Sequence, residues 1–160
     1  MDWYEVTEDY HERTLGADHD LDVLPHEWQR ELAAIWRLEA DVNNGAYLQF
    51  IENWGVASYE YAVQGLRKMG AKTMARIIEK CHKLVLENTD PALDEADRFR
   101  GLLSNPIINE DGSLTHPPPS PIPEKAARKI YDLSYEFMDY PDDIETLGCA
   151  YYGSLVENDA

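Results

Sequence analysis

Cysteine and long apolar runs are scarce in this sequence. Its two cysteines, Cys81 and Cys149, lack the CxxC spacing of zinc and redox sites, and a chain of 160 residues can build a core without disulfides. No apolar run approaches the roughly 18 residues that a membrane span needs, and the first nine residues are acidic where a signal peptide would be basic. We therefore expect a soluble, cytoplasmic protein with free, buried thiols.

Basic residues are also few. The chain has 14 Lys and Arg against 31 Asp and Glu, which gives a formal net charge of -17. Phosphate backbones and anionic membranes repel such a chain. The composition therefore argues against direct binding of nucleic acid or membrane, and it favours a basic protein as the partner.

The negative charge is concentrated at the two ends of the chain. Residues 1–31 carry a net charge of -8, residues 32–86 a net charge of +2, and residues 87–160 a net charge of -11. We therefore expect a nearly neutral helical core that holds two acidic flanks.

Motifs for metal or cofactor chemistry are missing as well. The five histidines are scattered without HExxH spacing, which predicts surface residues in place of a metal site. Cys81 and His82 resemble a nucleophile beside its base, but adjacent helical residues point about 100° apart and Cys81 lies on an apolar stripe. Neither GxGxxG nor GxxxxGK[ST] occurs. We expect no cofactor and no metal.

One acidic run superficially resembles the start of a calcium loop. Asp18, Asp20 and Asp22 alternate as in an EF-hand, but the sixth position is Val23 and the twelfth is Gln29. A calcium loop needs glycine and glutamate at these two places. The run therefore predicts an acidic surface.

Apolar spacing of three and four residues predicts an all-α fold, a single domain over residues 1–160 with about seven helices. The pattern is clearest over residues 71–88. Three helices are expected between residues 25 and 69, with Pro25 in the first turn of the first and Ser58 as the cap of the last. A further helix is expected over 90–104 with Leu93 and Phe99 inward. The last two helices are expected to begin at Pro123 or Glu124 and at Asp142 or Asp143, and their apolar positions include Tyr135, Tyr151 and Leu155. No period-two pattern of strands is present, so we expect no sheet. Residues 105–123 are rich in proline and predict a long loop before the last two helices, with a local turn at Asp111-Gly112.

Clusters of carboxylates are the candidate partner-binding residues. The simplest interpretation of such a cluster is a solvated helix face that keeps the protein soluble. Paired carboxylates could also catalyse acid/base chemistry, if a pocket raises the pKa of one of them. The candidates are Glu5, Glu8, Asp9, Glu12, Asp18, Asp20, Asp22, Asp94, Glu95, Asp97, Asp139, Asp142, Asp143 and Glu145.

The segment from residue 28 to residue 86 carries a more specific pattern. A glutamate near a helix end precedes an Asn-Gly-x-aromatic-x-Gln-aromatic block, an Asn, and a later aliphatic-Gly-Ala. The corresponding residues are Glu39, Asn44, Gly45, Tyr47, Gln49, Phe50, Asn53 and Gly70. We expect these residues to serve the fold; Gln49 and Asn53 lie four apart, where amide side chains cap helix ends or bridge backbone groups.

This block resembles the DNA-mimic-protein-nineteen-like family of bacterial helical domains. Ala46 stands in place of the family's second glycine and Trp54 in place of a small polar residue. The likeness covers about the middle half of the chain and leaves the acidic flanks outside. It implies an all-helical fold, a tendency to form homodimers, and an acidic surface that imitates duplex DNA and occupies a DNA-binding protein.

Three functions remain open at this point. The first is a non-enzymatic acidic protein that imitates DNA, and the second is an immunity-like inhibitor of a basic toxin or nuclease. The third is an enzyme with carboxylates in a concave site. The sequence favours the first two, because both use an acidic surface without requiring a pocket.

Overall fold

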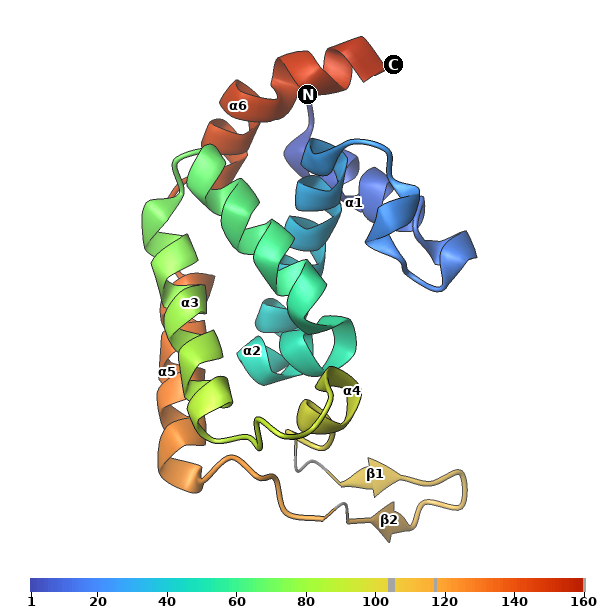
Figure 1. Cartoon of the computed structure of the whole chain (residues 1–160), viewed down its shortest axis with the longest axis vertical. Helices are drawn as coiled ribbons and strands as arrows, with labels where there is room; N and C mark the ends of the chain where they lie inside the picture. The colour runs from blue at the N-terminus through green and yellow to red at the C-terminus, as the bar shows by residue number, and fades with distance from the viewer. Residues whose placement is uncertain (104–105, 117, 160) are drawn as a thin grey trace.

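The computed structural model describes residues 1–103, 106–116 and 118–159, and most of them are helical (Figure 1). In chain order the elements are α1 (Trp3–Glu12), two short 3₁₀ turns (Leu15–Ala17 and Leu21–Val23), α2 (Glu27–Lys68), α3 (Lys72–Glu87), α4 (Glu95–Arg98), β1 (Ile107–Ile108), β2 (Leu114–Thr115), α5 (Glu124–Met138) and α6 (Ile144–Asp159). The predicted all-α class is confirmed. No helix in the described ranges is long and apolar enough to cross a membrane.

The three helices expected between residues 25 and 69 form one element, α2, with two kinks. Gly45 and Ala46 leave helical geometry, with a φ of 64° at Ala46, and Gly55 does so with a φ of 72°. A residue with positive φ interrupts the helical hydrogen-bond ladder and turns the chain. The element therefore folds back on itself as three helical segments (Figure 1).

Side chains from distant elements cap the restarted segments of α2. The amide of Tyr47 donates to Ser134 Oγ of α5 at 3.1 Å, and the amide of Val56 donates to Glu95 Oε1 of α4 at 2.6 Å. These bonds satisfy donors that the kinks leave without a helical acceptor. Ser58, which we expected to cap the last segment, is buried inside the helix.

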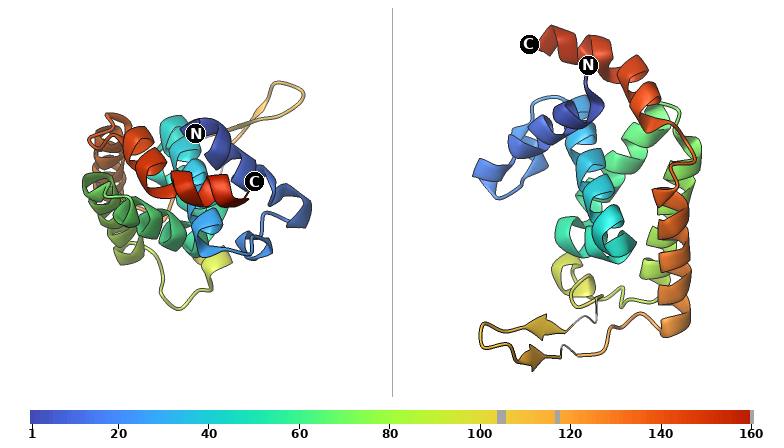
Figure 2. Two further views of the ribbon diagram at one scale, coloured as in Figure 1. Left: turned by 90° about the horizontal axis from the view of Figure 1, so that it is seen from above. Right: turned by 180° about the vertical axis from the view of Figure 1, so that it is seen from behind.

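The core surrounds α2, which packs against α1 on one side and against α3 and α5 on the other (Figure 2). The largest fully buried side chains are Trp3, Arg37, Tyr47, Tyr152, Phe50, Phe137, Leu32, Ile35, Leu38, Leu48, Ile51 and Leu66. The aromatic block of the sequence therefore lies at the centre of the molecule, as its spacing predicted.

The start of α2 differs from the expectation. Pro25 was expected in the first helical turn, but the helix begins at Glu27 and His26 is the capping residue. The amide of His26 donates to Gln29 Oε1 at 3.2 Å, which closes a capping box. The capping box thus sets the first helical residue at Glu27, two residues after Pro25.

The helix expected over residues 90–104 is wrong. Asp90 accepts from the amide of Ala92 in a local turn, and the helix is the short α4 with Asp94 as its cap. Leu93 was expected to point inward but is 46% exposed, while Phe99 is buried. The cap at Asp94 starts the helix late, and Gly101, with a φ of 66°, ends helical geometry soon after it.

The proline-rich region contains a small hairpin, so the expectation of no sheet is wrong. β1 and β2 pair antiparallel through Ile107 with Thr115 and Ile108 with Leu114. The turn predicted at Asp111-Gly112 is confirmed, because the amide of Gly112 donates to the carbonyl of Asn109 at 2.9 Å. The strands have two residues each and are exposed, so their sequence carries no alternation signal. Asn105 and Pro117 of the predicted loop lie outside the described residues.

The last two helices begin where the sequence predicted. α5 begins at Glu124 after Pro123, and Asp143 Oδ1 accepts from the amide of Thr146 in the first turn of α6. Three of the apolar positions expected in these helices are exposed: Tyr135 at 63%, Tyr151 at 42% and Leu155 at 37%. Tyr152, next to Tyr151, is buried instead.

Candidate protein-binding surfaces

The fold places the N-terminal acidic flank beside α6, the last helix of the C-terminal flank. α1 and α6 run in the same direction: Cys149 Sγ lies 3.5 Å from the Met1 carbonyl near their N-termini, and Tyr10 Oη lies 2.9 Å from Asp159 Oδ2 near their C-termini. The ring of Trp3 packs against Gly148, where an added Cβ would clash with it. Residues separated by more than 140 positions therefore share one surface (Figure 1).

α1 presents four of the predicted carboxylates on one face. Glu5, Glu8, Asp9 and Glu12 are all exposed, at spacings of three and four residues. Successive members of such a row rise about 4.5–6 Å along a helix axis. Asp9 is paired with Arg13 at 2.6 Å, while the other three have no ion-pair partner among the described residues.

The predicted acids of the 3₁₀ turns are exposed, but two of them have local partners. Asp20 Oδ1 accepts from the amide of Asp22 at 2.9 Å, and Asp22 lies 3.5 Å from Arg30. Asp18 has a φ of 52° and ends the first turn. These residues extend the acidic surface beyond the C-terminal end of α1.

The predicted acids of α4 lie at the opposite end of the molecule from α6 (Figure 1). Asp94 caps α4 through the amide of Asp97 at 3.0 Å, and Glu95 caps the last segment of α2. Asp97 is 3.6 Å from Arg100. The structure thus separates this cluster from α1, and hydrogen bonds of the fold occupy two of its three carboxylates.

The predicted acids between α5 and α6 also divide into caps and free groups. Asp142 Oδ2 accepts from the amide of Met74 at 2.8 Å, which caps α3, and Asp143 caps α6. Asp139 and Glu145 are exposed. This cluster adjoins the start of α1.

Tyr4 marks the place where the two flanks meet. Burial and the carboxylates of Glu39, Glu145, Asp143 and Asp2 raise the pKa of Tyr4. These four carboxylates come from α1, α2 and the start of α6, and sequence reasoning did not bring them together.

A hollow of about 190 Å³ opens beside Tyr4 and is lined by Tyr4, Trp36, Glu39, Ala40, Asn43 and Tyr140. Glu39 was assigned a role in the fold, and the residue is only 6% exposed. Tyr140 Oη donates to Glu39 Oε1 at 3.1 Å and Trp3 Nε1 to Glu39 Oε2 at 3.4 Å. Burial raises the pKa of Glu39 to about 7, against the opposing effect of these two hydrogen bonds.

The remaining motif residues surround the first kink of α2. Gln49 Nε2 and Asn53 Nδ2 donate to the two oxygens of Asp41 at 3.1 and 3.0 Å, and Asn44 Nδ2 donates to Gln49 Oε1 at 3.4 Å. An added Cβ at Gly45 would clash with the side chain of Gln49. These bonds connect the two helical segments on either side of the kink.

Other residues of the motif lie in the core of the protein. Tyr47 Oη lies 2.7 Å from His82 Nδ1, and Phe50 is fully buried beside Tyr47. Gly70 has a φ of 94° and ends α2, as its position predicted. The expectation that all histidines are surface residues is wrong, because His82 is 7% exposed.

A second buried histidine holds the N-terminal region on α2. His11 Nδ1 accepts from Arg37 Nε at 3.2 Å, and Arg37 also donates to Ser58 Oγ and Thr14 Oγ1. Burial and the guanidinium of Arg37 lower the pKa of His11 to about 4. The ring of His11 stacks on Trp36 at 4.0 Å, so this network supports one wall of the hollow.

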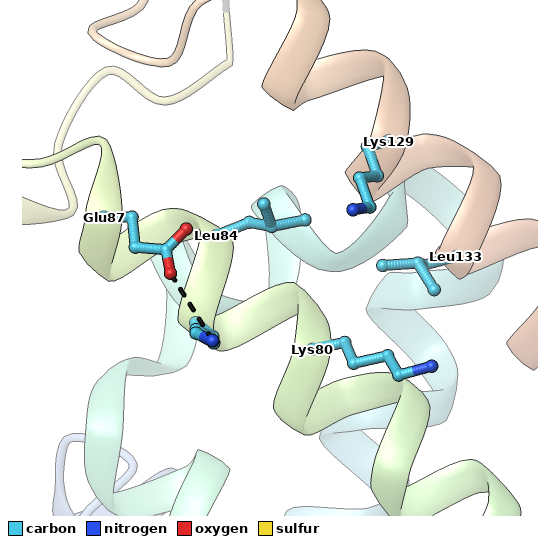
Figure 3. A pocket seen from close by; sticks show the side chains of 6 residues that line it. Lys80, Leu84, Glu87, Lys129 and Leu133 are labelled. Atoms are coloured by element: carbon cyan, nitrogen blue, oxygen red, sulfur yellow. Dashed lines mark ion pairs between the residues drawn. The ribbon is translucent and has the colours of Figure 1, made fainter.

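The structure also shows a basic groove that sequence reasoning did not predict. α3 and α5 pack together, and seven of the 14 Lys and Arg lie exposed on them: Lys72, Arg76, Lys80, Lys83, Lys125, Arg128 and Lys129. In Figure 3 Lys80 and Lys129 extend toward the groove between the helices, over Leu84 and Leu133. The sequence signal was the repeat at residues 72, 76 and 80, which places three cations on one helical face.

Among the described residues, no group of three or more His, Cys, Asp or Glu is arranged to hold a metal ion. The hollows are small and open, and most predicted acids lie on outward helix surfaces. The fold and surfaces define a small helical protein with an acidic surface and a separate basic edge.

Comparison of the chain with known protein families identifies the family to which it belongs. Residues 22–158 match the DMP19-like protein family, and the chain belongs to it. The match is longer than the resemblance to residues 28–86 suggested: it includes the C-terminal acidic region and excludes α1. No curated protein and no solved structure shows significant similarity to the chain.

Proposed function

We propose that this protein is a non-enzymatic, cytoplasmic interaction protein that imitates DNA and occupies the basic groove of a DNA-binding protein. The row of exposed carboxylates on α1, beside the acids that begin α6, is the observation that carries the proposal. Membership of the DMP19-like family supports it.

The spacing of the carboxylates suits a groove that binds phosphates. Glu5 and Glu12 lie seven residues apart, a rise of about 10 Å along the helix axis. A DNA strand presents a phosphate every 3.4 Å of axis, so Glu5 and Glu12 lie about three phosphate steps of one strand apart. A homodimer, which we also propose, would present two such rows.

The charge distribution supports a defined orientation of binding. The α3–α5 edge is basic, and α1 with α6 is acidic. A cationic groove attracts the acidic side from a distance and repels the basic edge, and salt weakens both effects.

A competition titration tests the proposal. Basic DNA-binding proteins of the native cell are bound to a fluorescent duplex, and this protein is added while anisotropy is read at 50 and 500 mM NaCl. We expect release of the duplex from at least one of them at low salt, reduced at least tenfold at high salt because the contacts are ionic.

Two variants with the same change in charge make the test specific. The first neutralises the row by Glu5→Gln, Glu8→Gln, Asp9→Asn and Glu12→Gln. The control neutralises four exposed acids elsewhere, by Glu60→Gln, Glu110→Gln, Asp132→Asn and Glu136→Gln. We expect the row variant to lose roughly tenfold in potency and the control to lose little.

Equal losses in the two variants would reject the α1 row as the binding surface. Absence of displacement for every protein at low salt would reject DNA mimicry itself. Capture of a single basic nuclease from the native cell would favour the immunity-like alternative.

A further inference from the structure

The hollow beside Tyr4 combines aromatic walls with a carboxylate at its base. Trp36, Glu39, Ala40 and Asn43 recur at spacings of three and four residues, so they form one stripe along α2. Tyr4 of α1 and Tyr140, which follows α5, complete the lining. Three separate parts of the chain therefore build the hollow.

Among the described residues, only neutral groups donate to the carboxylate of Glu39. The donors are Tyr140 Oη and Trp3 Nε1, and Asn43 Nδ2 in turn donates to Tyr140 Oη at 3.0 Å. Within the described part of the chain, no Lys, Arg or His nitrogen lies within 4 Å of this carboxylate. A buried carboxylate without a cation is unfavourable, and buried charges in proteins are usually paired.

The opening of the hollow is negatively charged. Asp2, Asp143 and Glu145 are exposed and lie close enough to Tyr4 to influence its ionisation. Tyr4 is 52% exposed at this rim, whereas Glu39 is 6% exposed. An approaching cation therefore meets exposed carboxylates before it reaches the buried Glu39.

We propose that this hollow receives one lysine or arginine side chain of the basic partner, which forms an ion pair with Glu39 between Tyr4, Trp36 and Tyr140. This inference rests on the proposed function and adds a specific anchor to the acidic surface. Anchors of this kind, a buried charge pair in an aromatic pocket, dominate many protein interfaces.

The chemistry of the lining selects a cation. Aromatic faces attract ammonium and guanidinium groups, and a carboxylate at the base adds a charge-assisted hydrogen bond. An anion is repelled by Glu39 and the rim. A neutral side chain leaves the buried carboxylate unpaired, so it gains nothing from the base of the hollow.

The test uses the whole protein and small probes. N-acetyl-arginine amide is titrated while NMR follows the indole N–H signals of the four tryptophans, with the citrulline amide as an uncharged probe of the same shape. The Trp3 indole donates to Glu39 and Trp36 lines the hollow, so we expect saturable shifts of these two signals. Trp28 and Trp54 should move little.

Variants show whether Glu39 is the anchor. We expect Glu39→Gln to weaken arginine amide binding roughly tenfold, because the ion pair is lost while the shape is kept. Tyr4→Ala, at an exposed position that the fold does not depend on, should weaken it by about threefold. Glu60→Gln changes the net charge equally at a distant surface and should have no effect. Equal binding by wild type and Glu39→Gln would overturn the proposal.

A peptide distinguishes a protein partner from a free small cation. A peptide with one arginine flanked by lysines should bind roughly tenfold tighter than arginine amide, because the rim carboxylates engage its neighbours. Equal affinity of the two probes would assign the hollow to a free cation and overturn the proposal.

The competition titration separates the two proposals. If Glu39→Gln displaces DNA as well as wild type does, the anchor is wrong and the proposed function stands. If wild type binds the arginine peptide through Glu39 but displaces no DNA, the anchor stands and DNA mimicry fails.

Discussion

Glu39 lines the same hollow as Tyr4 and Tyr140 and is 6% exposed, so a neutral side chain would be more favourable there. Its pKa of about 7, against an ordinary value of 4.5, means that the charged form is disfavoured by burial. Functional sites often retain groups that reduce stability. A cationic partner would remove this cost, which is why the residue fits a binding role.

Glu39→Gln should stabilise the folded protein at alkaline pH. The folded pKa lies above the unfolded one, so the native state binds more protons between about pH 4.5 and 7. The contribution of Glu39 to stability is complete below pH 4.5 and is lost as the pH rises through 7. The shift corresponds to at most about 3 kcal/mol, and loss of one hydrogen bond offsets part of it.

Urea unfolding of both proteins at pH 5 and pH 8 checks this prediction. We expect the variant to gain about 1–2 kcal/mol over wild type at pH 8 and to lose this advantage at pH 5. The other titrating groups are the same in both proteins, so their contributions cancel when the two free energies of unfolding are subtracted. A constant difference across this range would contradict a raised pKa at Glu39.

At the scale of elements, the two kinks of α2 determine where its segments lie. Ala46 and Gly55 have nearly the same dihedral angles, with φ of 64° and 72° and ψ of -178° and -171°. This region of φ and ψ suits glycine and strains any residue with a Cβ. One kink uses the favourable residue, and the other has an alanine.

Gly55→Ala should destabilise the protein by about 2 kcal/mol or more, because the new Cβ adds strain and meets the carboxylate of Glu95. Displacement of that carboxylate would also remove the cap on Val56. Urea unfolding monitored by circular dichroism measures the loss.

Ala46→Gly is the matched counterpart. The glycine relieves backbone strain at residue 46, which stabilises the fold. It also removes a buried methyl group and makes the unfolded chain more flexible, which destabilises the fold. We therefore expect a free energy of unfolding within about 1 kcal/mol of wild type. If Gly55→Ala were tolerated as well as Ala46→Gly, the kink at residue 55 would not depend on glycine.

At the scale of the whole molecule, charge is separated between two sides. The acidic ends of the chain meet at α1 and α6, and half of the basic side chains lie on α3 and α5. A partner with a basic groove should therefore bind the first side and leave the second exposed.

Lysine footprinting tests this orientation. In a complex with a basic partner, Lys80, Lys83 and Lys129 of the groove in Figure 3 should keep their reactivity toward an acylating reagent, as measured by mass spectrometry. The reason is that like charges repel across an interface. Protection of these three lysines by at least about threefold would place the partner on the basic edge and contradict the orientation.

The fold was predictable wherever local signals agreed with packing. α3 carries an apolar stripe at Met74, Ile78, Cys81 and Val85 that is buried as predicted, because any helix with such a stripe must cover it. The start of α4 was predicted wrongly, because Asp90 and Asp94 are both possible caps and the structure uses Asp94, while Asp90 closes a local turn.

The candidate site was predictable only in part. The acids of α1 were recognised from their type and spacing, but the hollow at Glu39 joins Tyr4 with Tyr140, residues 136 positions apart. Several predicted acids, Asp94 and Asp142 among them, proved to be helix caps.

By itself, the sequence determined that the chain is helical, acidic and built around the aromatic block near Asn44, because periodicity, charge and capping are local properties. The tertiary structure alone decided which carboxylates face solvent and which cap a helix. It also decided that Glu39 is buried in a hollow that Tyr4 and Tyr140 line. These outcomes depend on contacts between distant segments, and only the packing of α1, α2 and α6 brings those segments together.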